Sequence, residues 1–292
     1  MHDVSVTDLP RKCSTMMHRS AAASLVAALV LESGAALAGQ PIGPVPMVAE
    51  INARTITSML YQSKPGERPD LSNKFLVYLD LAGLNFKGAI LTRSDFYGTD
   101  FTGANLSGAD LSYTRLDRSV LIRANLSGAN LTGATIFRPT VYSDLENNTS
   151  DAPHFSGANL SRVHVQADLS GSDFRGADLT DADFHPLEDR PGQGTMTTMY
   201  KNVLKYCDFS GARLHNADMR RAVLWFAKFT GADISGARFV EADLSRADFA
   251  GADLTGADFT HANVDGTNFV GAKGLAAAKG LDQAVNLDKA LR

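Results

Sequence analysis

The stretch ADLSRADFAGADLTGADFTHAN, residues 242–263, repeats alanine, then aspartate or asparagine, then a large apolar residue every five positions. An α-helix turns by about 100° per residue, so large residues five apart would be scattered around its circumference. In a β-strand, side chains alternate between two faces, so a spacing of five sends successive large residues to opposite faces. The period therefore excludes a regular helix or a regular strand as the repeating unit.

The same trio recurs along most of the chain. With the large apolar residue as the centre of each repeat, residues 81–136 contain twelve centres, residues 155–184 contain seven, and residues 209–269 contain thirteen. The middle run includes one short step of four residues, from Val165 to Leu169. Repeats of this number indicate a repeat architecture, which has to be recognised before any other assignment is made.

A quarter-turn at every repeat explains the pattern. If the chain turns by about 90° per pentapeptide, each centre and the alanine two positions earlier point inward, and the other three residues face solvent. Four repeats then close one square coil, and coils stack about 4.8 Å apart with their backbone groups bonded between coils. Aspartate or asparagine before the centre bonds local backbone, and glycine or a small polar residue after the centre eases the corner.

The third run gives an internal check of this coil. On a twenty-residue coil its large residues sort by type, and three of the walls contain Phe209, Phe229, Phe249 and Phe269, then Leu214, Ile234 and Leu254, then Leu224, Leu244 and Val264. Because phenylalanine and leucine alternate along the run, this sorting fits any even number of repeats per coil and excludes three. The 32 repeats predict an all-β solenoid of about eight coils.

The tandem Ala-Asp/Asn-Leu/Phe-x-x pattern over about residues 79–271 resembles the pentapeptide-repeat family. What the resemblance implies is a right-handed quadrilateral β-helix. Many members of that family have no assigned activity, and some cytoplasmic members inhibit DNA gyrase by presenting an acidic rod that imitates DNA.

Residues 1–38 have the layout of a secretory signal peptide. Arg11, Lys12 and Arg19 precede an apolar run over residues 21–31, and small residues end at Ala38, after which we expect cleavage. Eleven apolar residues are too few to span a bilayer, which needs about 17–25. We therefore expect a periplasmic or secreted protein; a buried helix or an uncleaved anchor is the alternative.

Non-repetitive segments flank and interrupt the solenoid. Residues 39–78 are expected to form an N-terminal cap and linker, and residues 272–292 a C-terminal cap, because each has apolar residues near helical spacing. Those residues are Val48, Ile51, Met59 and Leu60 at one end and Leu275, Ala278, Leu281, Val285 and Leu287 at the other. Insertions near residues 138–153 and 186–202 break the repeats, and the sequence does not decide whether they share a side.

One group of residues departs from the polar exterior that the other repeats predict. The centres Leu204 and Leu224 are one coil apart, so their apolar neighbours should cluster outside as an exposed patch. These neighbours are Val203, Tyr206, Val223, Trp225 and Phe226. Two interpretations are open: the second insertion, with Met196, Met199 and Tyr200, covers the patch, or the patch binds a partner protein or a second copy in a homodimer.

The sequence contains no motif of a hydrolase, a zinc protease or a phosphate-binding loop. Cleavage after Ala38 would leave Cys207 as the only thiol, at a position where other repeats have alanine, so it is read as a small buried residue. The recurring aspartates are read as turn residues, and His154 and His164 are two corners apart. We therefore predict no catalytic residues, no cofactor and no metal.

The favoured interpretation is an exported, non-enzymatic solenoid that binds or scaffolds an unknown protein partner, without binding nucleic acid. A DNA mimic that binds a topoisomerase is the runner-up. The export signal weakens it, as do the basic residues Arg213, Lys228, Arg238 and Arg246, which interrupt the acidic columns. A structural protein without a specific ligand also fits the repeats, and a hydrolase built from the insertions has no motif that supports it.

Overall fold

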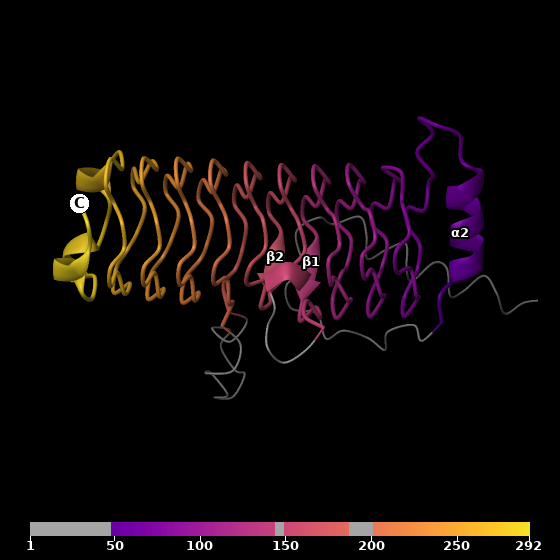
Figure 1. Cartoon of the computed structure of the whole chain (residues 1–292), viewed down its shortest axis with the longest axis horizontal. Helices are drawn as coiled ribbons and strands as arrows, with labels where there is room; N and C mark the ends of the chain where they lie inside the picture. The colour runs from indigo at the N-terminus through magenta and orange to yellow at the C-terminus, as the bar shows by residue number, and fades with distance from the viewer. Residues whose placement is uncertain (1–47, 144–148, 187–200) are drawn as a thin grey trace, which may run out of the picture. The chain divides into compact units, whose positions relative to one another are not determined.

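A computed structural model of the 292-residue chain describes residues 48–143, 149–186 and 201–292. The described residues belong to one compact unit, in which successive coils stack between the α-helix α2 (Ala53–Gln62) and three one-turn 3₁₀ helices near the C-terminus (Figure 1). These helices are η3 (Leu275–Ala277), η4 (Leu281–Gln283) and η5 (Leu287–Lys289). None of the helices in the described ranges is long and apolar enough to cross a bilayer.

The backbone of each coil pairs in parallel with the coil before and after it. In the last run the paired residues are twenty apart, and the pairing residue of one side follows that of the previous side by five, so each coil has four sides. We name the four ladders of pairing residues A to D in chain order: A contains Asp178, Arg213 and Asp233; B contains Asp183, Asp218 and Arg238; C contains Asp168, Val203 and Val223; D contains Asp173, Asp208 and Lys228.

Most of this pairing consists of single bridges between coils. Two short strands exceed that length: β1 (Thr135–Phe137) and β2 (His164–Gln166) lie side by side in parallel in ladder B, with Ile136 opposite Val165. Short sides follow from the five-residue period, because each corner interrupts the extended backbone after about three residues.

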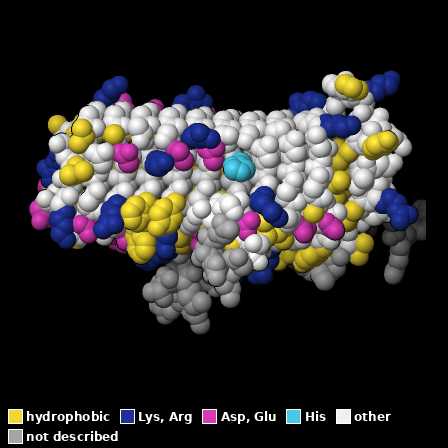
Figure 2. Space-filling model, viewed as in Figure 1, with side chains coloured by type: hydrophobic (Ala, Val, Ile, Leu, Met, Phe, Trp, Pro, Cys, Tyr) yellow, Lys and Arg dark blue, Asp and Glu magenta, His cyan; other side chains and the backbone are white. Residues whose placement is uncertain are grey.

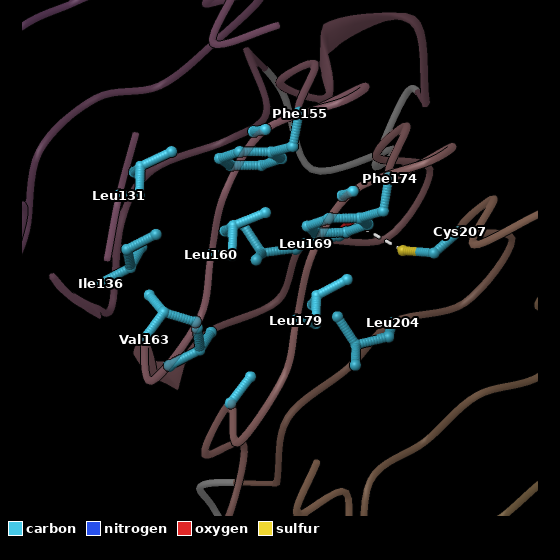
Figure 3. Packing of buried hydrophobic residues seen from close by; sticks show 14 of the residues in the cluster. Leu131, Ile136, Phe155, Leu160, Val163, Leu169, Phe174, Leu179, Leu204 and Cys207 are labelled. Atoms are coloured by element: carbon cyan, nitrogen blue, oxygen red, sulfur yellow. Dashed lines mark hydrogen bonds between the residues drawn. The ribbon is translucent and has the colours of Figure 1, made fainter. Parts of the chain in front are cut away.

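The interior is filled by the centres and by the small residues two positions before them, as the sequence predicts. Rings on the ladder D side form a continuous stack, in which Phe229 and Phe249 are 4.6 Å apart and nearly parallel. Phe239 and Phe259 stack beside them and meet the first column edge-on, at 5.8 Å and 85° between Phe239 and Phe249. The ladder D column contains Phe155, Phe174, Phe209, Phe229, Phe249 and Phe269, and Figure 3 shows its beginning.

Two local hydrogen bonds shape a typical corner that follows an aspartate or asparagine. At Phe249, the carbonyl accepts from the Ala252 N–H at 3.0 Å, and Oδ1 of the preceding Asp248 accepts from the Ala250 N–H at 3.0 Å. The second residue after the centre adopts a left-handed conformation, and Gly251 there has φ 67°. The sequence interpretation expected glycine or small polar residues at corners, but arginine, tyrosine and phenylalanine also occupy this position; Arg246 does so with φ 58°.

The N-terminal flank contains the expected helix, with a different buried face. The Asn52 side chain caps α2 by accepting from the Thr55 N–H at 2.9 Å, and the helix buries Ile56 and Leu60. Met59 is exposed. Coil pairing already begins at Asp70, which bridges to Ile90, so residues assigned from the sequence to a linker join the ladders.

The C-terminal flank is a further coil with six-residue sides. Gly274, Gly280 and Asn286 are its left-handed corners, and a 3₁₀ turn follows each one. Its pairing therefore drifts from the twenty-residue offset, and Val285 pairs with Asn263. The sequence spacing placed Val285 among the apolar residues of a helical cap, but the extra residue on each side turns Val285 outward, where it is 51 % exposed.

Candidate functional site

The two insertions adjoin the same side of the stack. The first leaves the ladder C side after Thr140 and returns to ladder D at His154, and the second leaves ladder B after Asp183 and returns to ladder C at Val203. Ladder C is therefore bordered by an insertion at each of its two corners. Residues 144–148 and 187–200, including Met196, Met199 and Tyr200, lie outside the described residues, as does the signal peptide expected at residues 1–38.

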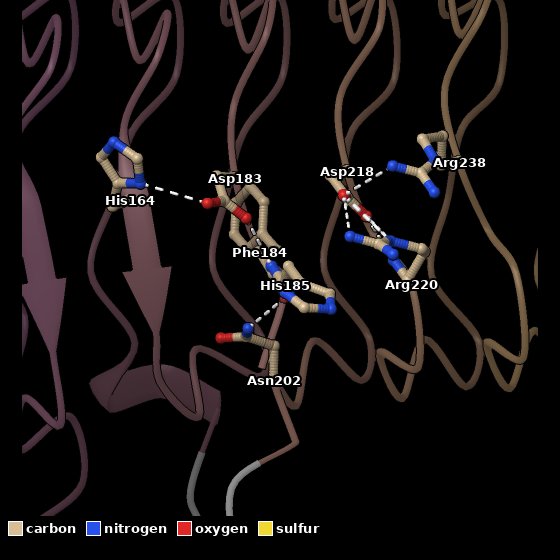
Figure 4. Close-up of polar contacts among 8 residues, drawn as sticks. All are labelled: His164, Asp183, Phe184, His185, Asn202, Asp218, Arg220 and Arg238. Carbon is tan, nitrogen blue, oxygen red and sulfur yellow. Dashed lines mark hydrogen bonds and ion pairs between the residues drawn. The ribbon is translucent and has the colours of Figure 1, made fainter. Parts of the chain in front are cut away.

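A buried asparagine fixes the point where the second insertion rejoins the coils. The four-residue step between Val165 and Leu169 leaves its corner one residue short, and the Asn202 side chain fills that corner. Its Oδ1 accepts from the Ala167 N–H at 2.8 Å, and its Nδ2 donates to the carbonyl oxygens of Val165, at 3.1 Å, and Phe184 (Figure 4). The side-chain amide of Asn202 thus makes the hydrogen bonds that a backbone peptide group would make in a complete corner. Asn202 directly precedes Val203, the first residue of the patch.

The structure brings the five residues of the sequence-predicted patch together at the corner between ladders C and D. Val203 and Val223 are bridge partners in ladder C. Tyr206 and Phe226 occupy consecutive left-handed corner positions, and their rings stack at 5.1 Å with 10° between their planes. Tyr206, Trp225 and Phe226 are 55 %, 39 % and 38 % exposed in the described structure. We call this group the aromatic corner.

Two cations that the sequence analysis did not assign to the patch complete the aromatic corner. The Lys205 ammonium lies 4.3 Å from the centre of the Trp225 ring, and the Arg246 guanidinium lies 5.4 Å from the centre of the Phe226 ring. Figure 2 shows hydrophobic side chains gathered in this part of the stack with lysine or arginine side chains next to them. The sequence contains the information that places both cations here. Lys205 is twenty residues before Trp225, and Arg246 is twenty residues after Phe226, so each cation lies one coil from its ring.

Side chains also occupy the corner positions before and after the ring stack of the aromatic corner. In the coil before Tyr206, Gly171 holds the corner position, and Thr149 of η1 (Thr149–Asp151) occupies the space where a Cβ at Gly171 would lie. In the coil after Phe226, the Arg246 side chain runs along the edge and comes within 3.4 Å of a Cβ position built on Gly266. Within the described residues, the Arg246 guanidinium therefore lies over the Phe226 end of the ring stack, and Tyr206 and Phe226 remain 55 % and 38 % exposed.

Tyr142 anchors the first insertion next to the same corner. Its hydroxyl oxygen lies 3.0 Å from the Asp168 carboxylate and 3.1 Å from the Ser170 carbonyl, so its single proton is shared between these two acceptors. Burial and the Asp168 charge raise the pKa of Tyr142 far above its ordinary value, so the phenol stays protonated and a donor.

The other residues considered in the sequence analysis have structural surroundings. Cys207 is fully buried, its Sγ contacts the Leu169 carbonyl at 3.2 Å, and burial raises the pKa of its thiol. His154 belongs to ladder D and His164 to ladder B, on opposite sides. Within the described ranges there is no group of three or more His, Cys, Asp or Glu side chains that could hold a metal ion.

Of the four basic residues expected to interrupt the acidic columns, Arg213 and Arg238 form ion pairs with neighbouring coils, and Lys228 in ladder D forms none within the described residues. Arg246 lies at a left-handed corner and not in a ladder, so it does not interrupt an acidic column. Arg213 in ladder A lies 2.7 Å from a carboxylate oxygen of Asp178, and Arg238 in ladder B lies 3.3 Å from one of Asp218 (Figure 4). The carboxylate columns on these two sides are therefore partly neutralised over the C-terminal half of the stack.

Comparison with known proteins identifies the repeats. The family model described as pentapeptide repeats matches eight copies, in residues 76–108, 99–136, 154–185, 207–246 and 237–273, which together cover more than half of the chain. No curated protein matches the chain.

Several solved structures are similar to this chain. One is HetL from the cyanobacterium Nostoc, a pentapeptide repeat protein involved in heterocyst differentiation regulation, with 22% identity, a TM-score of 0.44 and coverage of 83% of this chain and 100% of HetL. Another is full-length QnrB1, a plasmid-mediated fluoroquinolone resistance protein, with 20% identity, a TM-score of 0.31 and coverage of 71% and 85%. A third, from the thylakoid lumen of Arabidopsis thaliana, has 28% identity, a TM-score of 0.16 and coverage of 39% and 63%.

Proposed function

Since the chain belongs to the pentapeptide-repeat family, whose members form right-handed quadrilateral β-helices and are generally non-enzymatic, we propose that it is an exported β-helical scaffold that binds another protein through its aromatic corner. In this proposal about eight coils, covered by α2 at one end and closed by the six-residue coil at the other, hold the binding surface rigid. The export rests on the signal-like sequence of residues 1–38.

The observation that carries the proposal is the exposure of three aromatic rings at one corner. The coil that follows has Ser245 and Arg246 at the positions of Trp225 and Phe226, so the fold itself does not require aromatic residues there. Aromatic side chains contribute strongly to protein interfaces, because they bury large areas and lose little conformational entropy. Rings held at the surface of a rigid solenoid are therefore suited to bind a partner.

DNA mimicry is the less well supported alternative. It requires continuous negative charge, and the pairs Arg213–Asp178 and Arg238–Asp218 interrupt the charge on two described sides. If the protein were found uncleaved in the cytoplasm and its addition reduced gyrase activity, DNA mimicry would become the better supported of the two functions.

The proposal is tested by giving the aromatic corner the residues of the next coil. The double variant Trp225→Ser/Phe226→Arg should fold normally, since Ser245 and Arg246 already occupy these positions one coil later. The control is Tyr113→Arg, which removes an exposed ring at a left-handed corner of another side.

The assay is crosslinking in the exported fraction, followed by identification of the captured protein and measurement of its Kd with the purified chain. We expect the double variant to lose this partner and the control to keep it, with melting temperatures close to that of the wild type. A large fall in melting temperature of the double variant alone, with the Kd of the wild type retained, would show that the rings serve internal packing.

A further inference from the structure

We infer that the aromatic corner recognises a short acidic segment, in which an apolar side chain packs against the rings and carboxylates on either side of it meet Lys205 and Arg246. This inference rests on the proposed function and adds the chemistry of the partner. It follows from the charges that border the rings, from the small size of the apolar area and from the rigidity of the corner.

The cations at the aromatic corner differ from those of the neighbouring ladders. Lys205 and Arg246 make no ion pair within the part of the chain that the structure describes. In the ladders on the other sides, Arg213 and Arg238 are held by carboxylates of an adjacent coil. Lys205 and Arg246 instead lie over ring faces, where a cation keeps most of its donors directed to solvent or to a ligand.

The ladder carboxylates of the coil that follows this corner, Asp243 and Asp248, are engaged by their own repeats. Oδ1 of Asp243 accepts from the Ser245 N–H at 3.2 Å and from Asn263 Nδ2 at 3.1 Å. Asp248 accepts from the Ala250 N–H and from Asn268 Nδ2, at 3.0 and 2.8 Å. These bonds fix the carboxylates in their ladders and leave the cations over the rings available to carboxylates of a partner.

The extent of the apolar area favours a peptide over a membrane. Val203 and Tyr206 belong to one coil and Val223, Trp225 and Phe226 to the next, so the area spans two coils. The flanking ladder positions are acidic, with Asp168 in the coil before and Asp243 in the coil after. A planar anionic bilayer lying on this corner would press against these carboxylates, whereas a segment of a few residues fits between them.

The rings are also held in place before any ligand arrives. Tyr206 and Phe226 are nearly parallel at 5.1 Å, and the Arg246 guanidinium lies over the Phe226 ring at 5.4 Å. A surface that is already ordered loses little side-chain entropy on binding, so a short peptide with few contacts can be recognised.

A library of random heptapeptides, displayed and selected on the immobilised full chain, tests this inference. We expect the enriched peptides to have aspartate or glutamate on both sides of a leucine, isoleucine or aromatic residue. For a synthetic enriched peptide, the variant Lys205→Gln/Arg246→Gln should raise the Kd roughly tenfold, and added salt should raise it further. The matched control Arg213→Gln/Arg238→Gln removes two cations that are already paired and should leave the Kd unchanged.

The outcomes separate this inference from the proposed function. Enriched peptides that are neutral or basic, and that lose binding in Trp225→Ser, would overturn the acidic ligand and leave a protein-binding corner. Binding that is insensitive to Trp225→Ser would overturn both. A third outcome would identify the ligand as an anionic lipid surface instead of a peptide. In that case no peptide is enriched, and the protein co-sediments with phosphatidylglycerol vesicles but not with phosphatidylcholine vesicles. This co-sedimentation is lost in Trp225→Ser.

Discussion

Replacing Asn202 by alanine tests how the irregular corner beside the aromatic corner is held. The wild-type side chain is fully buried and bonds the Ala167 N–H and the carbonyl oxygens of Val165 and Phe184. Asn202→Ala removes all three bonds and leaves three buried backbone groups without these partners. Each buried unsatisfied group costs about 1–3 kcal/mol, and relaxation or entry of water recovers part of the total, so we expect a loss of about 3–4 kcal/mol.

The assay is equilibrium unfolding in urea followed by circular dichroism, together with thermal melting. For a domain of this size, the expected loss corresponds to a fall in melting temperature of roughly 10 °C. The control is Asn125→Ala, because Asn125 has the usual place of asparagine in a repeat and its Oδ1 accepts a local bond from the Ser127 N–H at 3.0 Å. Its loss should cost about 1 kcal/mol.

A second variant separates the hydrogen bonds from simple loss of volume. Asn202→Asp keeps the size of the side chain but places a carboxylate against the carbonyl oxygens of Val165 and Phe184. Burial and these carbonyls raise the folded-state pKa of such a carboxyl, so the variant should be least stable at neutral pH and recover stability as the pH falls. An Asn202→Ala variant as stable as Asn125→Ala would refute the role of Asn202 as a substitute for a peptide group.

Three further predictions follow from single groups. Cys207 should resist alkylation in the folded protein and react only in denaturant, because burial raises the pKa of its thiol; modification of the native protein at the rate of a free thiol would contradict its buried position. Hydrogen bonds from Thr255 lower the pKa of Asp253, so the stability that Asp253 contributes is complete above its unfolded pKa, about 4, and is lost as the pH falls through the folded value. Asp253→Asn should therefore flatten the dependence of stability on pH in acid, and an unchanged slope would rule this out. N-terminal sequencing of the exported protein should give Gly39 as the first residue, and a sequence beginning at Met1 or Met16 would exclude cleavage after Ala38.

The stacked interior could be predicted because the spacing of the repeats alone determines which residues of successive coils lie next to each other. The conformation of the corners is not needed for this prediction. Phe229 and Phe249 are twenty residues apart, and the sorting of residue types by wall required an even number of repeats per coil. The neighbours of Trp225 followed from the same spacing. The period contains this information because each coil contacts only the coils next to it.

Features that depend on local exceptions could not be predicted in the same way. The sequence shows that a residue is missing between Val165 and Leu169, but the side chain that replaces it comes from Asn202, 37 positions from Val165 and at the end of an insertion. Lys205 and Arg246 could have been assigned by applying the twenty-residue spacing to charged residues as well. In the terminal coil, Gly274, Gly280 and Asn286 are six residues apart, and this spacing indicates sides of six residues. The spacing of the apolar residues alone indicated a helix there instead.

Disulfide formation between introduced cysteines measures directly whether residues one coil apart meet at the aromatic corner. In a chain with Cys13→Ala and Cys207→Ala, the pair Tyr206→Cys/Phe226→Cys should form a disulfide readily under mild oxidation, because paired coils bring Cα atoms within the range of about 4.4–6.8 Å that a disulfide spans. The pair Tyr206→Cys/Arg221→Cys is closer in sequence but lies on a different corner, and it should remain reduced. Crosslinking of the second pair in preference to the first would contradict the twenty-residue coil, and with it the placement of every residue at the aromatic corner.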